Sequence, residues 1–161
     1  MSARFIFVDL IIESKAMEIN GFKFKTRIQL RFKDTDQMGH VNNANHLTYF
    51  ELARVAYFNE VIAEKIEWNK EGIILARIEV DYKSPVLLED ELWVHIRLSK
   101  IGRTSFDMEY KIVRINGNVE VIAAEGKSVQ VCFNYELNKP IPVPESWKVK
   151  ALNFEPAFHS Q

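Results

Sequence analysis

The sequence predicts an α+β fold in which a curved antiparallel β-sheet wraps around one long central helix. Three patterns carry this prediction. Residues 22–32 alternate apolar and polar side chains, residues 44–66 carry apolar side chains at helical spacing, and alternation returns from residue 77 onward. A single apolar helix needs an apolar wall to lie against, and a curved sheet around it provides that wall.

The first strand is predicted over residues 22–32. One face of this segment, FKFKTRIQLRF, is apolar, and the other carries lysine, arginine and glutamine side chains. A period of two is typical of a half-buried strand with one face in water. The basic face does not predict nucleic-acid binding, because the formal net charge of the chain is -1 and the two signs are mixed along it.

The central helix is predicted over residues 44–66. Apolar side chains recur along it every three or four positions, at Leu47, Phe50, Ala53, Tyr57 and Val61. Further apolar residues widen this surface, so we expect the helix to be largely enclosed. On its narrow polar stripe, Glu51 and Arg54 are three positions apart and are expected to pair.

Four antiparallel strands are predicted after the helix, with alternation at residues 77–83, 94–98, 106–112 and 118–133. The dipeptide Asn116-Gly117 predicts a hairpin with a type I′ turn, which needs two residues that tolerate positive φ. A sheet covered by one helix keeps open edges, so pairing with a second copy of the chain through an edge is also predicted.

The 161 residues predict one domain, at 22–145, with an N-terminal extension or extra strand at 1–21 and a C-terminal tail at 146–161. The segment at residues 138–158 carries four of the five prolines and is expected to run over the surface with at most a short helix. The apolar run near the N-terminus contains Asp9 and is too short to span a membrane, so no membrane partner is expected. The single cysteine, Cys132, excludes an intramolecular disulfide and favours the cytoplasm.

The stretch DTDQMGHVNN, residues 34–43, concentrates the side chains that can do chemistry. Asp36 follows the end of a strand, and Asn42 or Asn43 is a suitable N-cap for the helix behind it. The first-turn amides of a helix carry partial positive charge, and Gly39 allows a sharp bend or a close ligand. A carboxylate facing those amides can attack a carbonyl, or activate water, while the amides hold the oxyanion.

An inert, well-capped connection uses the same residue types, so the residues alone leave both interpretations open. Asp34 is expected to face solvent or to cap the loop. A lone histidine such as His40 is more often structural than a proton carrier, and His46 is expected to make a core or dimer contact. No second histidine lies at a recognised ligand spacing from Asp34, Asp36 and His40, so no metal is expected. Cys132 is expected to be a buried filler.

The segment RFKDTDQMGHVNNANHLTYFELAR, residues 31–54, closely resembles the opening of hotdog-fold acyl-CoA thioesterases of the 4-hydroxybenzoyl-CoA thioesterase superfamily. The resemblance continues through SKIGRTSFDMEY and VCFNYELNKPIPVP and covers residues 22–145. It implies a hotdog fold, hydrolysis of an acyl-CoA thioester, and a homodimer or homotetramer. It implies no cofactor and no metal, since coenzyme A is part of the substrate.

The resemblance also implies roles for single residues. The second aspartate of the family's D-x-D motif is the catalytic carboxylate, as nucleophile or general base, and here it is Asp36. The backbone amide seven positions on polarises the thioester carbonyl, and here it belongs to Asn43. His40 matches the histidine of a branch that resembles plant acyl-carrier-protein thioesterases. In this chain His40 is expected to orient water or the carboxylate, or only to pack. That branch usually has an asparagine where this chain has Met38.

The segment IGRTSF matches the part of the family that contacts coenzyme A. Arg103 falls on a phosphate-binding position, which suits a guanidinium group. Gly102 allows the pantetheine arm to approach the backbone, and Thr104 falls where a relative carries a basic residue. The acyl chain is expected to lie along the helix near Phe50 and Tyr49, against the partner subunit.

Two other functions compete with hydrolysis. Hotdog enoyl-CoA hydratases place their histidine five positions after the aspartate in a D-x-N-P-x-H pattern, whereas His40 lies four positions after Asp36 and neither the asparagine nor the proline is present. A non-catalytic protein that binds acyl-CoA is the second alternative, and retention of Asp36 argues against it.

Overall fold

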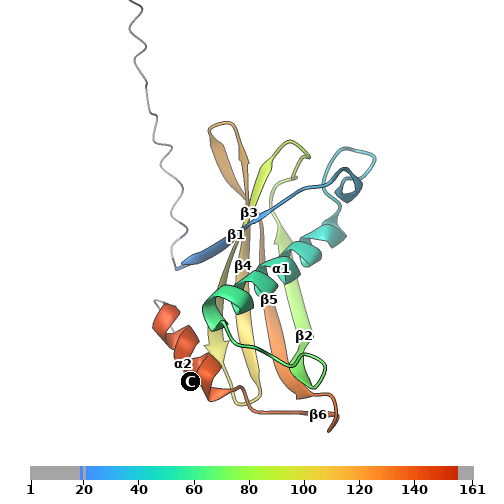
Figure 1. Ribbon diagram of the computed structural model, residues 1–161. Helices are drawn as coiled ribbons and strands as arrows, with labels where there is room; N and C mark the ends of the chain where they lie inside the picture. Colours follow the sequence, from blue (N-terminus) through green and yellow to red (C-terminus); the bar gives the residue numbers. More distant parts are fainter. Residues whose placement is uncertain (1–18, 20, 156–161) are drawn as a thin grey trace, which may run out of the picture.

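The structure is a computed structural model that describes residue 19 and residues 21–155. Its main elements follow the predicted order of one strand, one long helix and then further strands (Figure 1). They are β1 (Phe24–Ile28), α1 (Asn43–Tyr57), β2 (Glu71–Tyr82), β3 (Glu91–Ile101), β4 (Ser105–Asn116), β5 (Val119–Asn134), β6 (Lys139–Pro140) and α2 (Glu145–Phe154). The predicted fold class, α+β with a hotdog arrangement, is confirmed.

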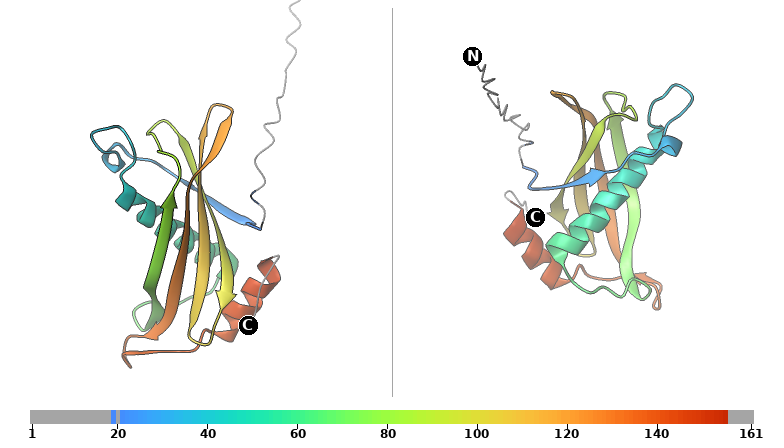
Figure 2. Two further views of the ribbon diagram at one scale, coloured as in Figure 1. Left: turned by 180° about the vertical axis from the view of Figure 1, so that it is seen from behind. Right: turned by 45° about the horizontal axis from the view of Figure 1, so that its top comes forward.

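One antiparallel sheet has the strand order β1-β3-β4-β5-β2, with the short β6 paired to β5. α1 crosses the concave face of this sheet, as all three views show (Figures 1 and 2). The loop between β1 and α1 lies at one end of the sheet, and the β3–β4 turn lies at the other end (Figure 2). This separation of the two ends decides which residues of one chain can meet.

The buried face of α1 forms the centre of the core. Tyr49, Phe50, Ala53 and Tyr57 are each at most 1% exposed. Phe50 stacks on Tyr110 of β4 with ring centroids 4.4 Å apart, so helix and sheet interlock.

The expectation that α1 is enclosed on most sides is wrong. Leu47, Leu52 and Val55 are 40%, 48% and 52% exposed, because the sheet covers only the face of the helix that is turned toward it. The predicted pair on the polar stripe is confirmed, since Arg54 and Glu51 form a 3.9 Å ion pair.

The predicted start of the helical region is confirmed, because α1 begins at Asn43 with Asn42 as its N-cap, but the predicted end is wrong. The α-helical part ends at Tyr57 rather than near residue 66. One π-helical turn, Phe58–Ile62, follows, and Ala63 then ends the helix in the left-handed conformation with φ 49°. The first strand is also shorter than predicted, because the chain turns into a 3₁₀ helix, Phe32–Asp34, before α1.

The predicted β4–β5 hairpin is confirmed, but its turn type is not. Asn116 pairs with Val119, so Gly117 and Asn118 form the two-residue loop. Gly117 has φ 57°, whereas Asn118 is not in the positive-φ region. A glycine with positive φ at the first loop position is typical of a type II′ turn rather than the predicted type I′ turn.

The predicted short helix near the C-terminus is α2, and it packs into the core. Trp147 is 6% exposed and lies edge-on to Phe58, with centroids 5.0 Å apart. After α2, Glu155 accepts a 2.7 Å hydrogen bond from the hydroxyl of Tyr57 on α1. The extra strand or arm predicted at the N-terminus lies outside the described residues. Within the described chain, no helix is long and apolar enough to cross a membrane.

Candidate active site

The loop between β1 and α1 is a closed, tight turn. Its sides meet in an isolated bridge between Thr35 and Val41. The Asp36 amide donates to the His40 carbonyl oxygen at 2.7 Å, and the Gly39 amide donates to the Asp36 carbonyl oxygen at 3.0 Å. Gly39 has φ 79°, a conformation that glycine adopts without a steric penalty, so this residue makes the bend possible.

The carboxylate of Asp36 is held by this loop through one of its two oxygens. Oδ1 accepts the amides of Met38 at 2.8 Å and His40 at 3.2 Å. Within the described residues, Oδ2 accepts no hydrogen bond from the protein. The side chain is half-buried on the wall of a cavity of about 460 Å³, so one oxygen orients the carboxylate and the other is available to a reactant.

The amino end of α1 forms another wall of the same cavity. Asn42 is the N-cap, since its side chain accepts the Ala44 amide at 2.9 Å and its carbonyl oxygen accepts the Asn45 amide at 2.9 Å. The Asn43 amide donates to no acceptor within the described part of the protein, and the Tyr82 hydroxyl donates to the Asn43 carbonyl oxygen at 3.1 Å. The sequence therefore folds so that an uncapped amide and a half-free carboxylate share one cavity.

Two histidines also line this cavity. His40 is half-buried in the loop. His46 is 4% exposed, with Nδ1 at 3.4 Å from the Asn42 carbonyl oxygen and its ring edge-on to Tyr82 at 5.0 Å. Burial lowers the pKa of His46, which favours a neutral ring at neutral pH.

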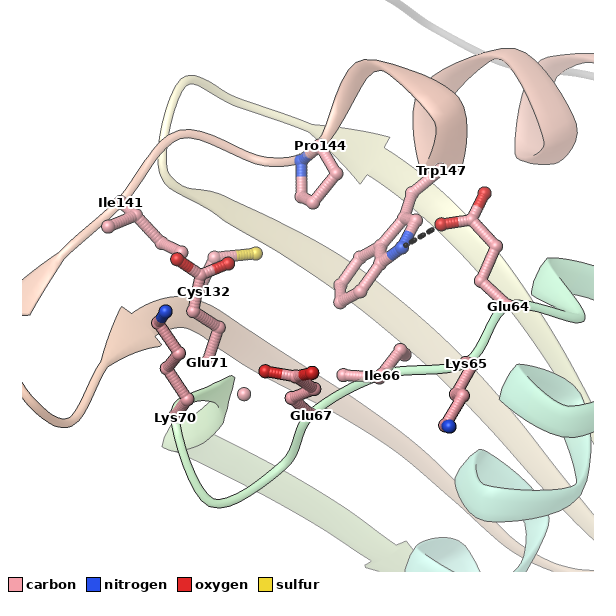
Figure 3. Close-up of a pocket in the computed structure, with 11 residues that line it drawn as sticks. Glu64, Lys65, Ile66, Glu67, Lys70, Glu71, Cys132, Ile141, Pro144 and Trp147 are labelled. Carbon is pink, nitrogen blue, oxygen red and sulfur yellow. Dashed lines mark hydrogen bonds between the residues drawn. The ribbon is translucent and has the colours of Figure 1, made fainter.

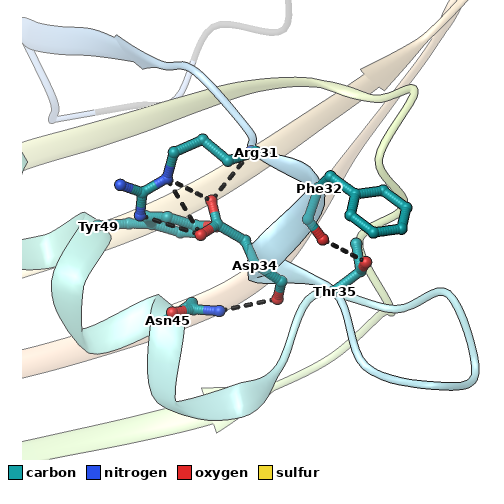
Figure 4. A network of polar contacts seen from close by, with 6 residues as sticks. All are labelled: Arg31, Phe32, Asp34, Thr35, Asn45 and Tyr49. Carbon is teal, nitrogen blue, oxygen red and sulfur yellow. Dashed lines mark hydrogen bonds and ion pairs between the residues drawn. The ribbon is translucent and has the colours of Figure 1, made fainter.

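The expectation that Asp34 faces solvent is wrong, whereas its capping role is observed. Asp34 is 1% exposed, and its carboxylate accepts the Arg31 amide at 3.0 Å and pairs with the Arg31 guanidinium at 3.0 Å (Figure 4). The Tyr49 hydroxyl donates to the same carboxylate at 3.1 Å. Burial alone would raise the pKa of the Asp34 carboxyl, but the hydrogen bonds from Arg31 and Tyr49 outweigh it and hold the pKa below its usual value.

The residues predicted to bind substrate do not join Asp36 within one chain. Gly102, Arg103 and Thr104 form the β3–β4 turn, closed by a 2.7 Å bond from the Gly102 amide to the Ser105 carbonyl oxygen. β3 separates this turn from the Asp36 end of the sheet, and its 11 residues span about 35 Å. Phe50 is fully buried in the core and does not line the cavity at Asp36.

A second cavity, of about 340 Å³, lies at the far end of the sheet, beside the β3–β4 turn (Figure 3). Cys132 lines it, and the Cys132 amide donates to the Thr104 carbonyl oxygen at 2.9 Å. Burial raises the pKa of the Cys132 thiol to about 12, so the thiol stays protonated and is a poor nucleophile, in line with the predicted filler role. Sequence reasoning missed this cavity because its walls come from the segment after the helix, the start of β2, β5, and α2 with the residues before it, which share no local motif.

Metal binding finds no candidate among the residues that the structure describes. No group of three or more histidine, cysteine, aspartate or glutamate side chains there is arranged to hold an ion. Asp34, one of the three residues weighed for a metal, directs its carboxylate to Arg31 and Tyr49.

A comparison with protein-family models matches residues 30–151 to the thioesterase-like superfamily. The chain belongs to this superfamily. The acyl-CoA thioesterase YbgC of Haemophilus influenzae is 28% identical over 144 residues, which cover 87% of this chain and 96% of that protein. A thioesterase of Thermus thermophilus, solved in complex with coenzyme A and zinc, is 37% identical, with a TM-score of 0.71 over 84% of this chain and 96% of its own.

Two further solved structures agree on the fold. A predicted thioesterase of Bacillus stearothermophilus is 30% identical, with a TM-score of 0.71 over 83% of this chain and 98% of its own. The PA5185 protein of Pseudomonas aeruginosa is 20% identical, with a TM-score of 0.75 over 86% of this chain and 96% of its own, and it supports the fold alone. The family predicted from DTDQMGHVNN and the segments after it is therefore confirmed.

Proposed function

We propose that this protein hydrolyses an acyl-CoA thioester to a free acid and coenzyme A. The observation that carries the proposal is the Asp36 carboxylate, which is oriented by two amides through Oδ1 only and lines the same cavity as Asn43, whose amide is uncapped. The names of similar proteins support the chemistry, since the Haemophilus influenzae relative is an acyl-CoA thioesterase and the Thermus thermophilus relative was solved with coenzyme A.

In this reaction the thioester carbonyl oxygen points to the Asn43 amide. Asp36 either attacks the carbonyl carbon or takes a proton from a water molecule that attacks it. The amide holds the oxyanion that develops, and one such preorganised donor is worth about 3 kcal/mol of barrier. Collapse breaks the carbon–sulfur bond, and coenzyme A leaves as a thiolate that takes up a proton. On the general-base route this step also forms the free acid. On the nucleophilic route the acyl group stays on Asp36 as a mixed anhydride, and a water molecule then hydrolyses the anhydride to the free acid and the regenerated carboxylate. His40, on the cavity wall, orients the water or the carboxylate.

We further infer that the working unit is at least a dimer, paired through β2. This strand is an edge of the sheet and exposes Ile74 and Leu75, which are 38% and 45% accessible. β2 begins at the second cavity, where Glu71 contributes to the wall, and ends at the Asp36 cavity, where Tyr82 does. Antiparallel pairing of β2 with its copy sets each Asp36 cavity beside the far end of the other subunit.

Such a dimer brings the residues predicted to contact coenzyme A close to the Asp36 cavity of the other subunit. Arg103 of the partner subunit then lies on the side from which the nucleotide end of coenzyme A reaches the Asp36 cavity. A guanidinium suits phosphate, and Arg103 is exposed in the single chain. We place this activity in the cytoplasm, on the ground that the one cysteine forms no intramolecular disulfide.

Thiol release from a panel of acyl-CoAs tests the proposed activity. The panel varies chain length and compares aliphatic with aromatic acyl groups, and free thiol is measured with a chromogenic reagent. We expect hydrolysis of at least one member with saturation kinetics. Saturable binding of acyl-CoA without thiol release contradicts hydrolysis and supports the non-catalytic binding protein instead.

A further inference from the structure

We propose that Asp34 is a positioning residue that holds the Asp36 loop in place against the amino end of α1. The proposal rests on the reacting role that the proposed function gives to Asp36. Asp34 does not line the Asp36 cavity, so it acts through the loop rather than on the substrate.

Asp34 is attached to α1 at three points over the first two turns of the helix. Its carbonyl oxygen accepts the Asn42 amide at 2.9 Å and the Asn45 side-chain amide at 2.8 Å. Its carboxylate accepts the Tyr49 hydroxyl at 3.1 Å. Figure 4 shows the last two contacts, which approach Asp34 from the same helix. The residue is therefore fixed to the N-cap, the first turn and the second turn together.

The other side of Asp34 is fixed to the segment that leaves β1. Arg31 donates its backbone amide to Oδ2 at 3.0 Å, and its guanidinium donates Nη2 to Oδ1 at 3.0 Å (Figure 4). The buried Asp34 carboxylate has little freedom to move, because a displacement would break its bonds to both the backbone amide and the guanidinium of Arg31 and leave the charge unpaired. Asp34 is thus held between the end of the strand segment and the helix.

The loop transmits this position to Asp36. Asp34 and Asn42 stand at the two ends of the loop and bond to each other, and the Thr35–Val41 bridge and the Asp36–His40 bond close it further inward. Asp36 is two residues from Asp34, so a shift of Asp34 relative to α1 moves the carboxylate relative to the Asn43 amide. Misplacement by about 1 Å can cost about 100-fold in rate.

The structure offers a matched pair of variants to test this. Tyr49 and Tyr57 both lie on α1, are at most 1% exposed, and donate their hydroxyls to a buried carboxylate, that of Asp34 at 3.1 Å and that of Glu155 at 2.7 Å. Tyr49→Phe removes one hold on Asp34, whereas Tyr57→Phe removes an equivalent bond at the opposite end of the helix. Each variant loses one buried hydrogen bond without a change of ring volume.

We expect Tyr49→Phe to lower kcat for the best acyl-CoA about tenfold with KM unchanged, and Tyr57→Phe to leave both constants near wild type. In an Asp36→Asn background, Tyr49→Phe should have no further effect on the residual rate, because the hydroxyl acts through that carboxylate. Equal losses of kcat in the two tyrosine variants, or a full additive loss in the Asp36→Asn background, overturn the proposal.

Amide hydrogen exchange tests the same proposal without any activity. The amides of Met38 and His40 bind the Asp36 carboxylate, so their exchange reports the order of the loop. Tyr49→Phe should speed exchange at both amides several-fold, and Tyr57→Phe should not. Unchanged exchange in Tyr49→Phe overturns the proposal. If the wild-type protein releases no thiol but this exchange contrast is present, the proposed hydrolysis fails while the positioning role stands.

Discussion

At the scale of single residues, the site depends on two local features that follow each other along the chain, the turn at Gly39 and the helix cap at Asn42. Gly39 turns the loop so that the Met38 and His40 amides orient Asp36, and Asn42 caps the next helix so that the Asn43 amide is left without an acceptor within the described residues. Because each feature acts within a few positions of the chain, the local pattern predicted a carboxylate at Asp36 facing the first-turn amides of a helix, and the family resemblance then singled out Asp36 and the Asn43 amide as the candidate pair.

Asp34 shows where local patterns fail at this scale. Its burial depends on Tyr49, which is 15 positions away and approaches only after α1 folds against the loop. An aspartate between a strand and a helix is usually a surface cap, and nothing within its own neighbourhood in the sequence distinguishes this one. The residue type of Asp34 was enough to predict its capping role. Its burial depends on the tertiary contact with α1, which the local sequence does not indicate.

His95 on β3 carries a pH prediction at the residue scale. It is 7% exposed, its Nδ1 has no partner within the described residues, and burial, with a smaller contribution from Lys25, lowers its pKa from 6.5 to about 4. Lys111 also disfavours the charged ring, and Glu120 favours it. Between pH 6.5 and 4, the His95 ring therefore binds a proton in the unfolded chain but stays neutral in the folded protein. The free energy of unfolding consequently falls as the pH falls through this window.

Urea denaturation at about pH 7 and about pH 4.5 measures this effect. We expect the free energy of unfolding of the wild-type protein to be lower at the lower pH. Each unit of difference between the pKa of His95 in the unfolded and the folded protein can contribute at most about 1.4 kcal/mol to this drop. His95→Leu should show a smaller drop, because it has no ring to protonate. An equally steep drop in His95→Leu assigns the pH dependence to other groups and contradicts the prediction.

At the scale of the elements, α1 links the core to the site. Its buried face was predictable because Phe50, Ala53 and Tyr57 recur at helical spacing, and its start was predictable from the asparagines. Its end was not, because the π-helical turn at Phe58–Ile62 depends on α2, where the Lys150 ammonium group donates to the Ile62 carbonyl oxygen. That contact joins residues 88 positions apart in the sequence.

The cap of α1 gives a prediction at this scale. Asn42→Ala removes the acceptor of the Ala44 amide, which should cost about 1 kcal/mol of unfolding free energy in chemical denaturation. The first turn should also fray, so kcat should fall by more than that loss of stability explains. Asn153→Ala, on the exposed side of α2, is the matched control. Full activity in a measurably destabilised Asn42→Ala would show that the order of the first turn does not matter to the reaction.

At the scale of the whole molecule, the single chain holds the two halves of the expected site at opposite ends. The sequence predicted Asp36 and Arg103 as parts of one site, but it could not predict their separation, which follows from the direction of β3 between them. The second cavity could not be predicted from the sequence either, because Cys132 and Trp147 come together only when α2 packs over the sheet. A dimer across β2 joins these parts again.

A charge on the β2 edge tests this assembly. Leu75→Glu should shift the protein to a smaller species in light scattering after gel filtration, because an unpaired carboxylate opposes burial in an interface. Activity should fall with the dimer. Leu152→Glu, at a leucine of similar exposure on α2, should change neither. A Leu75→Glu protein of unchanged mass and activity contradicts pairing through β2.

The rate of Asp36→Asn is the most direct test of the central claim, that the carboxylate at the amino end of α1 cleaves the thioester. Asp90→Asn is its control, because Asp90 also caps its own loop, through a 2.9 Å bond from the Leu87 amide, outside the cavity. With the best acyl-CoA of the panel, kcat of Asp36→Asn should fall about 10²- to 10⁴-fold while Asp90→Asn keeps most of its activity. An Asp36→Asn enzyme as fast as wild type would contradict the claim.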